Sequence, residues 1–190
     1  YVFHRDHGYE TGWGDPAYSN SDINNLNNTQ TLPVVFSINC LTDKYYYSEC
    51  FAEKFLRRAN GGAVGVFAHG EVSYSGYNDG LSIGLIDAIW SFPGFIPNFT
   101  GSAHNPVGTP TSHSPVYNMG FVGIQGLVRM VQTWGNSKYT FELLNWFGDP
   151  AMRIWTANPS AITATHDNSI DCGDNYLNIY SCSINDALAT

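Results

Sequence analysis

The sequence predicts an α/β fold built on parallel strands, and two apolar runs with the segment between them carry that prediction. Tyr1-Val2-Phe3 is aromatic and β-branched and ends in a polar turn, as a strand leaving a sheet does. Residues 32–38 form a nearly continuous apolar run of strand length, which is typical of a parallel strand buried on both faces. Between them, residues 15–31 are rich in Asn, Ser and Asp, with Ile23 and Leu26 at helical spacing. A crossover through this segment gives a βαβ-like unit.

A histidine and a cysteine stand just past these two strands. His7 follows the first run and Cys40 follows the second, so both are expected at the carboxyl ends of parallel strands, where open α/β sheets bind ligands. An imidazole beside a thiol generates the reactive thiolate and then protonates the leaving group. We therefore expect His7 and Cys40 to face one cleft, with the sulfur within a few ångströms of a ring nitrogen. The amides of Gly8 and Cys40 are the expected donors to a developing oxyanion. The alternatives are an inert buried thiol and an ordinary His-Gly turn.

Several segments resemble one family of peptidases. The stretch from His7 to Asp15 is similar to the histidine loop of the gingipain family of cysteine peptidases, His-Gly-x-Glu-Thr-x-Trp-x-Asp, in the caspase-like clan. Further segments resemble the same family in the same order: Asn39-Cys40, residues 50–57, residues 62–68, Ser73-Tyr74 and residues 139–156. The resemblance covers roughly residues 1–157 and implies a caspase-like, mostly parallel sheet flanked by helices.

The resemblance also implies residue roles. It assigns His7 as general base and acid, Cys40 as nucleophile, and the amides of Gly8 and Cys40 as the oxyanion hole. Substrate contacts are expected from Glu10 and from the segment Ser73, Tyr74 and Ser75. Family members place a tryptophan where this chain has Ser75, so this wall of the pocket is expected to be smaller and more polar. The residues after Cys40 lack the glycine or small residues often found there, and both departures bear on substrate preference.

The family places the histidine strand near the middle of its catalytic domain. The resemblance therefore implies that a portion of the sheet precedes Tyr1 and supplies an acidic residue that orients His7. We expect a companion N-terminal chain or precursor segment to pair beside residues 1–3, because an apolar strand edge with little charge is an aggregation hazard. We find no stretch typical of a signal peptide or a membrane span.

Composition favours an extracellular protein. The 190 residues contain 8 Lys and Arg against 16 Asp and Glu, which gives a net charge of −8, and 15% of the residues are aromatic. Nucleic acids and anionic membranes bind basic surfaces, so this balance argues against both as partners. The length fits one large domain with a small remainder.

A boundary near residue 157 separates that remainder. Residues 157–160 have linker chemistry, and residues 162–166 and 177–180 alternate with period two. We assign residues 1–157 to the C-terminal portion of the catalytic domain. Residues 158–190 are too few for an independent β-sandwich, and they resemble the first strands of the immunoglobulin-like module that family members carry.

The other cysteines are interpreted by their context. Cys172 and Cys182 flank a short polar segment, and we predict a disulfide between them, which would favour an oxidising compartment. Cys50 begins an amphipathic stretch and is expected to be buried in a helix.

Remaining candidates have simpler interpretations. His4 and His7 share a His-x-x-His spacing, but on a strand these side chains point to opposite faces, which argues against shared zinc ligation. His69 is expected to be a satisfied edge histidine. Glu10 and Asp15 are candidates for contact with substrate or a cation. The polar loop at residues 77–79 carries oxygen ligands for calcium, which the family suggests. Residues 93–115 are expected to form a surface connector, and Asn27 and Asn98 match glycosylation acceptors.

We therefore predict a secreted or cell-surface bacterial cysteine endopeptidase that hydrolyses protein or peptide substrates through a thioester on Cys40. Catalysis needs no cofactor, and a structural calcium ion follows from the family alone. The alternative is an inactive extracellular structural or adhesive protein on a peptidase scaffold. A Rossmann-like binding domain is disfavoured because no Gly-rich phosphate loop follows a strand.

Overall fold

The computed structural model describes most of the first 157 residues and parts of the C-terminal segment. Contacts divide the chain into two units, Tyr1–Ile154 and Trp155–Thr190, and each is described by itself. The described residues are 1–91, 113–157, 163–167, 169, 172–173 and 179–181.

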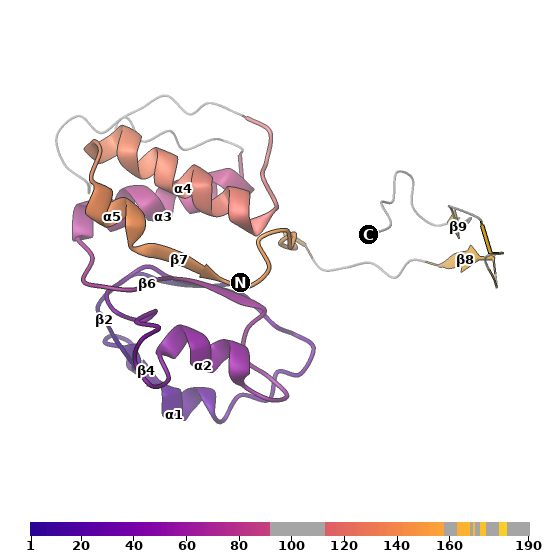
Figure 1. Ribbon diagram of the computed structural model, residues 1–190, viewed down its shortest axis with the longest axis horizontal. Coiled ribbons are helices and arrows are strands. Elements are labelled where there is room, and N and C mark those ends of the chain that lie inside the picture. Colours follow the sequence, from indigo (N-terminus) through magenta and orange to yellow (C-terminus); the bar gives the residue numbers. More distant parts are fainter. Residues whose placement is uncertain (92–112, 158–162, 168, 170–171, 174–178, 182–190) are drawn as a thin grey trace. The chain divides into compact units, whose positions relative to one another are not determined.

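The first unit contains a four-stranded sheet in the order β1-β5-β6-β7 (Figure 1). These strands are β1 (Val2–His4), β5 (Val34–Ser37), β6 (Gly65–His69) and β7 (Leu144–Phe147). The first three are parallel, and β7 runs antiparallel to β6. The sequence prediction of a mostly parallel α/β sheet is therefore confirmed, and residues 32–38 do contain a central strand.

Helices cover both faces of this sheet (Figure 1). One face carries α1 (Asn20–Ile23) and α2 (Phe51–Arg57), and the other carries α3 (Ser75–Ile89) and α4 (Met119–Trp134). The short α5 (Lys138–Glu142) precedes β7. The parallel strands are thus buried on both sides, as parallel sheets require.

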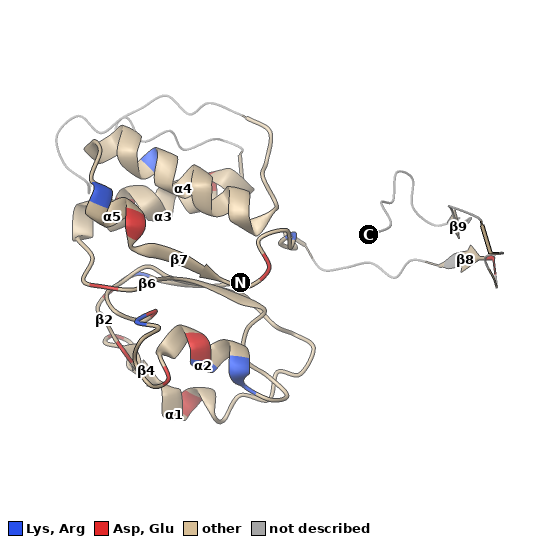
Figure 2. Cartoon of the chain, in the orientation of Figure 1, with Lys and Arg blue, Asp and Glu red and all other residues tan. Residues whose placement is uncertain are grey.

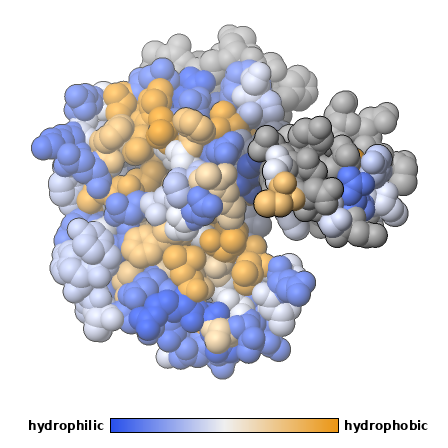
Figure 3. Space-filling view, turned by 45° about the vertical axis from the view of Figure 1, so that its right-hand side comes forward, coloured by the Kyte–Doolittle hydropathy of each residue, from blue (hydrophilic) through white to orange (hydrophobic). Residues whose placement is uncertain are grey.

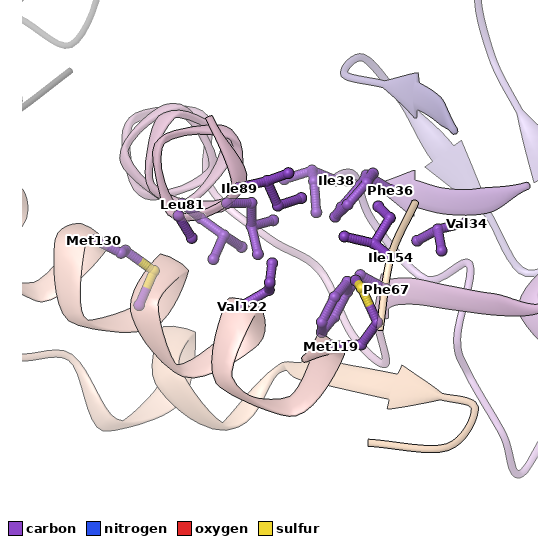
Figure 4. Close-up of a cluster of buried hydrophobic side chains, with 12 residues drawn as sticks. Val34, Phe36, Ile38, Phe67, Leu81, Ile89, Met119, Val122, Met130 and Ile154 are labelled. Atoms are coloured by element: carbon purple, nitrogen blue, oxygen red, sulfur yellow. The ribbon is translucent and has the colours of Figure 1, made fainter. Parts of the chain in front are cut away.

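The alternation within β5 explains the two-sided burial. Val34, Phe36 and Ile38 belong to the hydrophobic cluster between the sheet and helices α3 and α4, where Met119 lies beside Phe67 (Figure 4). Val35, which points to the opposite face, belongs to a second cluster with residues of α2. Side chains that alternate across a strand supply both clusters.

Helices α3 and α4 pack closely because glycines face each other. A Cβ atom on Gly84 would lie 3.0 Å from Cα of Gly126 and 2.6 Å from Cβ of Arg129. Where the helices meet, the buried Asp87 carboxylate lies 2.9 Å from Nε2 of His113 and 3.6 Å from a guanidinium nitrogen of Arg129. The helix pair is thus held by close backbone contact and by charge.

The segment between β1 and β5 differs from expectation. It contains a small antiparallel sheet of β2 (Gly8–Tyr9), β3 (Gly12–Trp13) and β4 (Tyr18–Ser19), followed by the four-residue α1. The expected helical crossover is thus limited to a single turn that buries Ile23. Ser19 and Asp22 form a capping box at its start, but the asparagines that follow are poor helix formers.

Charged residues are sparse on the first unit (Figure 2). Several are paired on or beside α2, where Lys54 lies 3.0 Å from Glu49 and Arg57 lies 3.0 Å from Glu53. Apolar and hydrophilic residues share the surface shown in Figure 3. No helix among the described residues is long and apolar enough to cross a membrane.

In the second unit, β8 (Ala164–His166) and β9 (Ile179–Ser181) form an antiparallel pair. Both fall within or beside the two period-two segments of the sequence. The immunoglobulin-like module and the domain boundary at residue 157 remain predictions.

Candidate active site

Cys40 lies just past the carboxyl end of β5 and is half-buried. Its sulfur accepts a hydrogen bond from the Ser73 amide at 3.4 Å and lies 3.6 Å from the Ser73 carbonyl oxygen and 3.8 Å from its hydroxyl. The Ser73 hydroxyl in turn accepts a hydrogen bond from the buried Asn78 amide at 2.7 Å. The segment between β6 and α3 therefore fixes the position of the thiol.

His7 lies on the loop between β1 and β2, and its side chain is exposed. The Gly14 amide donates to the His7 carbonyl at 2.9 Å, which closes the base of the loop. The next residue, Gly8, is buried, and a Cβ atom there would lie 2.6 Å from the Cys40 carbonyl oxygen and closer still to Oδ1 of Asn39. The histidine loop and the Cys40 loop are thus in direct contact at the same edge of the sheet.

The two side chains are not joined. Among the described residues, no hydrogen bond connects the His7 ring to the sulfur of Cys40, whose partner is Ser73. The expected close approach of the two groups therefore stays a prediction. Catalytic hydrogen bonds are commonly loose until substrate binds.

Arg5 ties the histidine loop to the start of α3, a role that no sequence pattern indicated. Its guanidinium binds the Asp79 carboxylate at 2.7 and 3.1 Å. It also donates to the carbonyl and hydroxyl oxygens of Ser75, each at 2.9 Å. Ser75 was expected to form a polar wall for substrate, and in the structure it anchors Arg5. Residues 77–79, expected to form a polar loop, lie in the first turns of α3, where Asn78 binds Ser73 and Asp79 binds Arg5.

Two tyrosines stand beside the Cys40–Ser73 contact. Tyr74 is exposed, and its ring centroid lies 6.0 Å from that of Tyr139. The Tyr139 hydroxyl donates to the Val72 carbonyl at 2.9 Å. Desolvation raises the pKa of Tyr139, and the nearby Tyr74, Glu71 and Cys40 add to the effect. These rings provide an aromatic surface next to the thiol.

Glu10 forms an ion pair with Lys44 at 3.1 Å. Its own backbone amide and then the Lys44 ammonium lower the pKa of Glu10. The carbonyl of Glu10 also accepts from the Phe51 amide at 2.8 Å. Glu10 therefore joins the histidine loop to the segment that follows Cys40, and its contact with substrate stays a prediction.

The residues after Cys40 carry two features that the sequence did not predict. Leu41 has a φ of 63°, a left-handed conformation that is costly for a residue with a Cβ atom. This is the conformation that glycine adopts most readily, although the residue here is leucine. Asp43 is fully buried, and desolvation raises its pKa to about 7. The Asn145 amide partly offsets this shift, although neither carboxyl oxygen has a partner at hydrogen-bonding distance.

His4 and His69 differ from His7 in that both are buried. His4 is buried and bonded to Asn39 at 2.8 Å, whereas His7 is exposed. His69 is the last residue of β6, and its Nδ1 donates to the Asn39 carbonyl at 2.8 Å. Burial lowers the pKa of His69 to about 4, so its ring is neutral at pH 7. His69 is therefore satisfied, as expected.

The cysteines outside the site have distinct surroundings. Cys50 is fully buried at the N-cap of α2, and burial raises the pKa of its thiol. Cys172 is exposed, whereas Cys182 lies outside the described residues, so their disulfide stays a prediction. Asn98 and most of the expected connector 93–115 also lie outside the described residues, and Asn27 is exposed.

The fold and the edge on which Cys40 and His7 lie are those of a cysteine peptidase scaffold. The model of peptidase family C25 matches residues 1–155, and the chain belongs to this family. This match and the gingipain relatives described next confirm the chain's resemblance to the gingipain family.

Curated relatives and solved structures agree with this assignment. Gingipain R1 of Porphyromonas gingivalis is 24% identical over 192 residues, which cover 100% of this chain and 18% of that protein. Gingipain R2 of the same species is 22% identical, over 100% of this chain and 24% of that protein. The chain thus spans about a fifth to a quarter of the length of these relatives.

The likeness to solved structures extends over most of the chain. The crystal structure of the Arg specific cysteine proteinase gingipain R superposes with a TM-score of 0.70 at 21% identity, over 89% of this chain and 36% of that chain. A complex of Porphyromonas gingivalis RgpB pro- and mature domains gives a TM-score of 0.64 at 20% identity, over 88% of this chain and 37% of that chain. At these identities the likeness shows the fold.

Proposed function

We propose that this chain carries the nucleophile and the histidine of a cysteine endopeptidase. The observation that supports this proposal most directly is the contact of Gly8 with Cys40, which brings the histidine loop against the loop that carries Cys40. Among the described residues, Cys40 is the only cysteine at the carboxyl end of a strand. Cys40 itself is half-buried rather than enclosed in the core.

The proposed reaction proceeds through a thioester. His7 accepts the proton of the Cys40 thiol, and the thiolate attacks the carbonyl carbon of the scissile peptide bond. The amides of Gly8 and Cys40 stabilise the oxyanion. Protonated His7 then gives its proton to the leaving amine as the C–N bond breaks. Water, deprotonated by His7, hydrolyses the thioester and restores the thiol.

The substrate is a protein or peptide that lies along the surface beside Cys40. Ser73, Tyr74 and Ser75 form one side of this surface, and Glu10 stands on the histidine loop. The hydroxyl of Ser75 already accepts a hydrogen bond from Arg5. We therefore expect Tyr74 to make the direct substrate contacts on this side. The residue preferred on the acyl side of the cleaved bond is set elsewhere in the protein.

The whole protein's organisation is also proposed. A companion N-terminal chain or precursor segment pairs beside β1 and supplies the acidic residue that orients His7; a neighbouring structure contains pro- and mature domains together. The relatives are bacterial gingipains, and we propose a secreted or surface protein. Its second unit begins an immunoglobulin-like module with the Cys172–Cys182 disulfide. The thiol chemistry itself uses no cofactor, and structural calcium belongs to the same proposal.

The alternative is an inactive extracellular structural or adhesive protein on the same scaffold. One observation favours it, namely that His7 is exposed and forms no hydrogen bond with Cys40 among the described residues. It predicts that the scaffold folds normally while Cys40 reacts no faster than an ordinary half-buried thiol.

Iodoacetamide labelling at mildly acidic pH and peptide hydrolysis distinguish the two. If His7 activates Cys40, Cys40 is labelled well before Cys50, and His7→Ala removes this selectivity. Cleavage of a mixed peptide library disappears in Cys40→Ala, whereas Cys50→Ala, which removes a buried thiol away from the site, retains it. Equal labelling of both cysteines, or no labelling of Cys40 in the folded protein, favours the inactive scaffold.

A further inference from the structure

His4 is buried at the end of β1, next to the loop that carries Cys40. Its Nε2 lies 3.2 Å from the carbonyl oxygen of Asp15, and its Nδ1 lies 2.8 Å from the side-chain nitrogen of Asn39. Its ring stacks on the Trp13 indole, with ring centroids 4.2 Å apart and an angle of 4° between the planes. The ring is thus fixed at both nitrogens and on one face.

These contacts settle which ring nitrogen carries the proton. A carbonyl oxygen only accepts hydrogen bonds, so Nε2 donates to Asp15. The Asn39 amide nitrogen only donates, so Nδ1 must accept with its lone pair. His4 is therefore neutral in this arrangement. A second proton on Nδ1 would face the N–H group of Asn39 and break the bond.

Asn39, the residue before Cys40, is held on every side. Its Oδ1 accepts from the hydroxyls of Thr42 at 2.9 Å and Ser37 at 3.2 Å. Its backbone carbonyl accepts from His69 at 2.8 Å. The Ser37 hydroxyl accepts from the Trp13 indole at 2.8 Å. His4, the last residue of β1, thus links this buried network to the strand that precedes the histidine loop.

The network connects both halves of the proposed site. Trp13 and Asp15 belong to the hairpin that follows His7, and Gly8 packs directly against the Asn39 side chain. Asn39 is covalently joined to Cys40. A shift of Asn39 would therefore move the nucleophile and its amide relative to Gly8 at the same time.

We propose that His4 and Asn39 form a positioning pair that holds the Cys40 backbone against the histidine loop, and that the pair requires the neutral imidazole of His4. This inference rests on the proposed function of Cys40 and His7. Neither His4 nor Asn39 touches the reacting atoms. Their effect is on the placement of the nucleophile, where a displacement of about 1 Å can cost roughly a hundredfold in rate.

The charges around His4 define the pH dependence. Burial lowers the pKa of His4 below its usual value. Three groups act to raise this pKa: the Asp15 carbonyl, the Asp6 carboxylate and the Asp15 carboxylate. The Arg5 guanidinium lowers it further. The group that the Cys40 loop after β5 places against the His4 ring is the uncharged side chain of Asn39. His4 is thus neutral at pH 7, and acidification below about 6.5, the usual pKa of a histidine, favours release of the pair.

The bond itself can be tested without activity. In uniformly ¹⁵N-labelled native protein, we expect a through-hydrogen-bond ¹⁵N–¹⁵N coupling between Nδ2 of Asn39 and Nδ1 of His4 at pH 7.5. The coupling should vanish on acidification as His4 gains its second proton. A His4 ring that carries a proton on Nδ1 at pH 7.5 would overturn the proposal.

Variants test the positioning role. His4→Leu removes the acceptor, and we expect the iodoacetamide rate of Cys40 and kcat for peptide hydrolysis to fall about tenfold to a hundredfold, with KM nearly unchanged. His4→Gln supplies an amide oxygen as acceptor and should recover much of this loss. Cys50, fully buried, reports unfolding in the same sample, because its labelling rises only when the core opens.

Asn28→Ala is the matched control, because Asn28 also holds two segments together. Its side chain bonds the Thr31 carbonyl and both backbone groups of Gly62, at 2.8 to 3.0 Å. We expect Asn28→Ala to lower stability without changing the Cys40 rate. If His4→Leu leaves the Cys40 rate and kcat unchanged, or matches Asn28→Ala, the positioning role is wrong while the peptidase proposal stands. If unmodified protein shows no selective Cys40 labelling, the peptidase proposal itself fails, and the ¹⁵N coupling still reports the bond.

Discussion

Gly8 lies so close to Cys40 that a Cβ atom on Gly8 would stand 2.6 Å from the Cys40 carbonyl oxygen. Real Cβ atoms do not approach an oxygen this closely, so only glycine permits the contact. The side chain at this position is therefore dictated by the neighbouring loop. The turn conformation itself makes no such demand, because Gly8 has no positive φ.

We expect Gly8→Ala to separate the two loops. The added methyl group meets backbone on the Cys40 side, which cannot rotate away, and overpacking of this kind costs about 1–3 kcal/mol. Thermal unfolding measures the cost, and selective labelling of Cys40 should be lost with it. Gly70→Ala is the control, because its nearest atoms would lie 3.5 Å away. Equal stability and equal labelling of the two variants would show that the loops do not depend on the contact.

Asp43 makes stability depend on pH in an unusual direction. Its folded pKa of about 7 lies above the unfolded value of 3.8, so the folded protein keeps the proton that the unfolded chain releases. The unfolded state binds fewer protons between about pH 4 and pH 7, and the Asp43 contribution to stability falls as pH rises through this range. Below about pH 4 both states are protonated, and the contribution is constant.

Asp43→Asn should remove this loss, because asparagine has the shape of the neutral acid and does not ionise. Relative to the unmodified protein, we expect the variant to gain stability steadily from pH 4 to pH 7, by an amount on the order of 4 kcal/mol at the upper end. Urea unfolding at several pH values measures the difference. A stability difference that does not change with pH would show that Asp43 is ionised in the fold.

Leu41 holds a left-handed conformation that favours glycine. Leu41→Ile keeps the apolar area but moves the branch to Cβ, and we expect it to lower the free energy of unfolding by about 1–2 kcal/mol. Leu41→Gly relieves the strain and loses a half-buried side chain, so its net effect should be smaller. Leu26→Ile, half-buried with a negative φ, is the control. If both Leu→Ile changes cost the same, Leu41 stores no strain.

Much of the sheet could be predicted from the sequence. Two-sided burial of β5 follows from a run in which every residue is apolar or small, and the turn beyond His7 follows from Gly8. The hairpin sheet between residues 8 and 19 was missed because strands of two residues are too short for an alternation to be visible. The antiparallel direction of β7 was also not predicted, since a single strand's composition carries no information about its orientation.

The network of the site was less accessible to sequence reasoning. The position of Cys40 after a buried strand was visible, but its link to Ser73 joins residues 33 positions apart. Arg5 and Asp79 are separated by 74 positions, and His4 and Asn39 by 35. Such pairs depend on how the strands and helices are placed, and each residue alone looks like an ordinary surface or strand residue.

The last prediction concerns the open edge of the sheet. Among the described residues, β1 is an end strand, and Val2 is 39% exposed. The His4 carbonyl accepts from the Ile38 amide on the β5 side at 3.0 Å. Because backbone groups alternate along a strand, the N–H and C=O groups of Phe3 point to the open edge.

We expect another segment of polypeptide to pair with this edge, because an unpaired apolar edge strand invites association. Hydrogen exchange followed residue by residue decides it. In the isolated chain, the Phe3 amide should exchange quickly while the His4 amide, on the β5 side, is protected. In native material both should be protected, and denaturing electrophoresis should reveal a second polypeptide or a longer chain. Fast exchange of Phe3 in native material would show that the edge of β1 is free, and the companion segment would then have no place in this sheet.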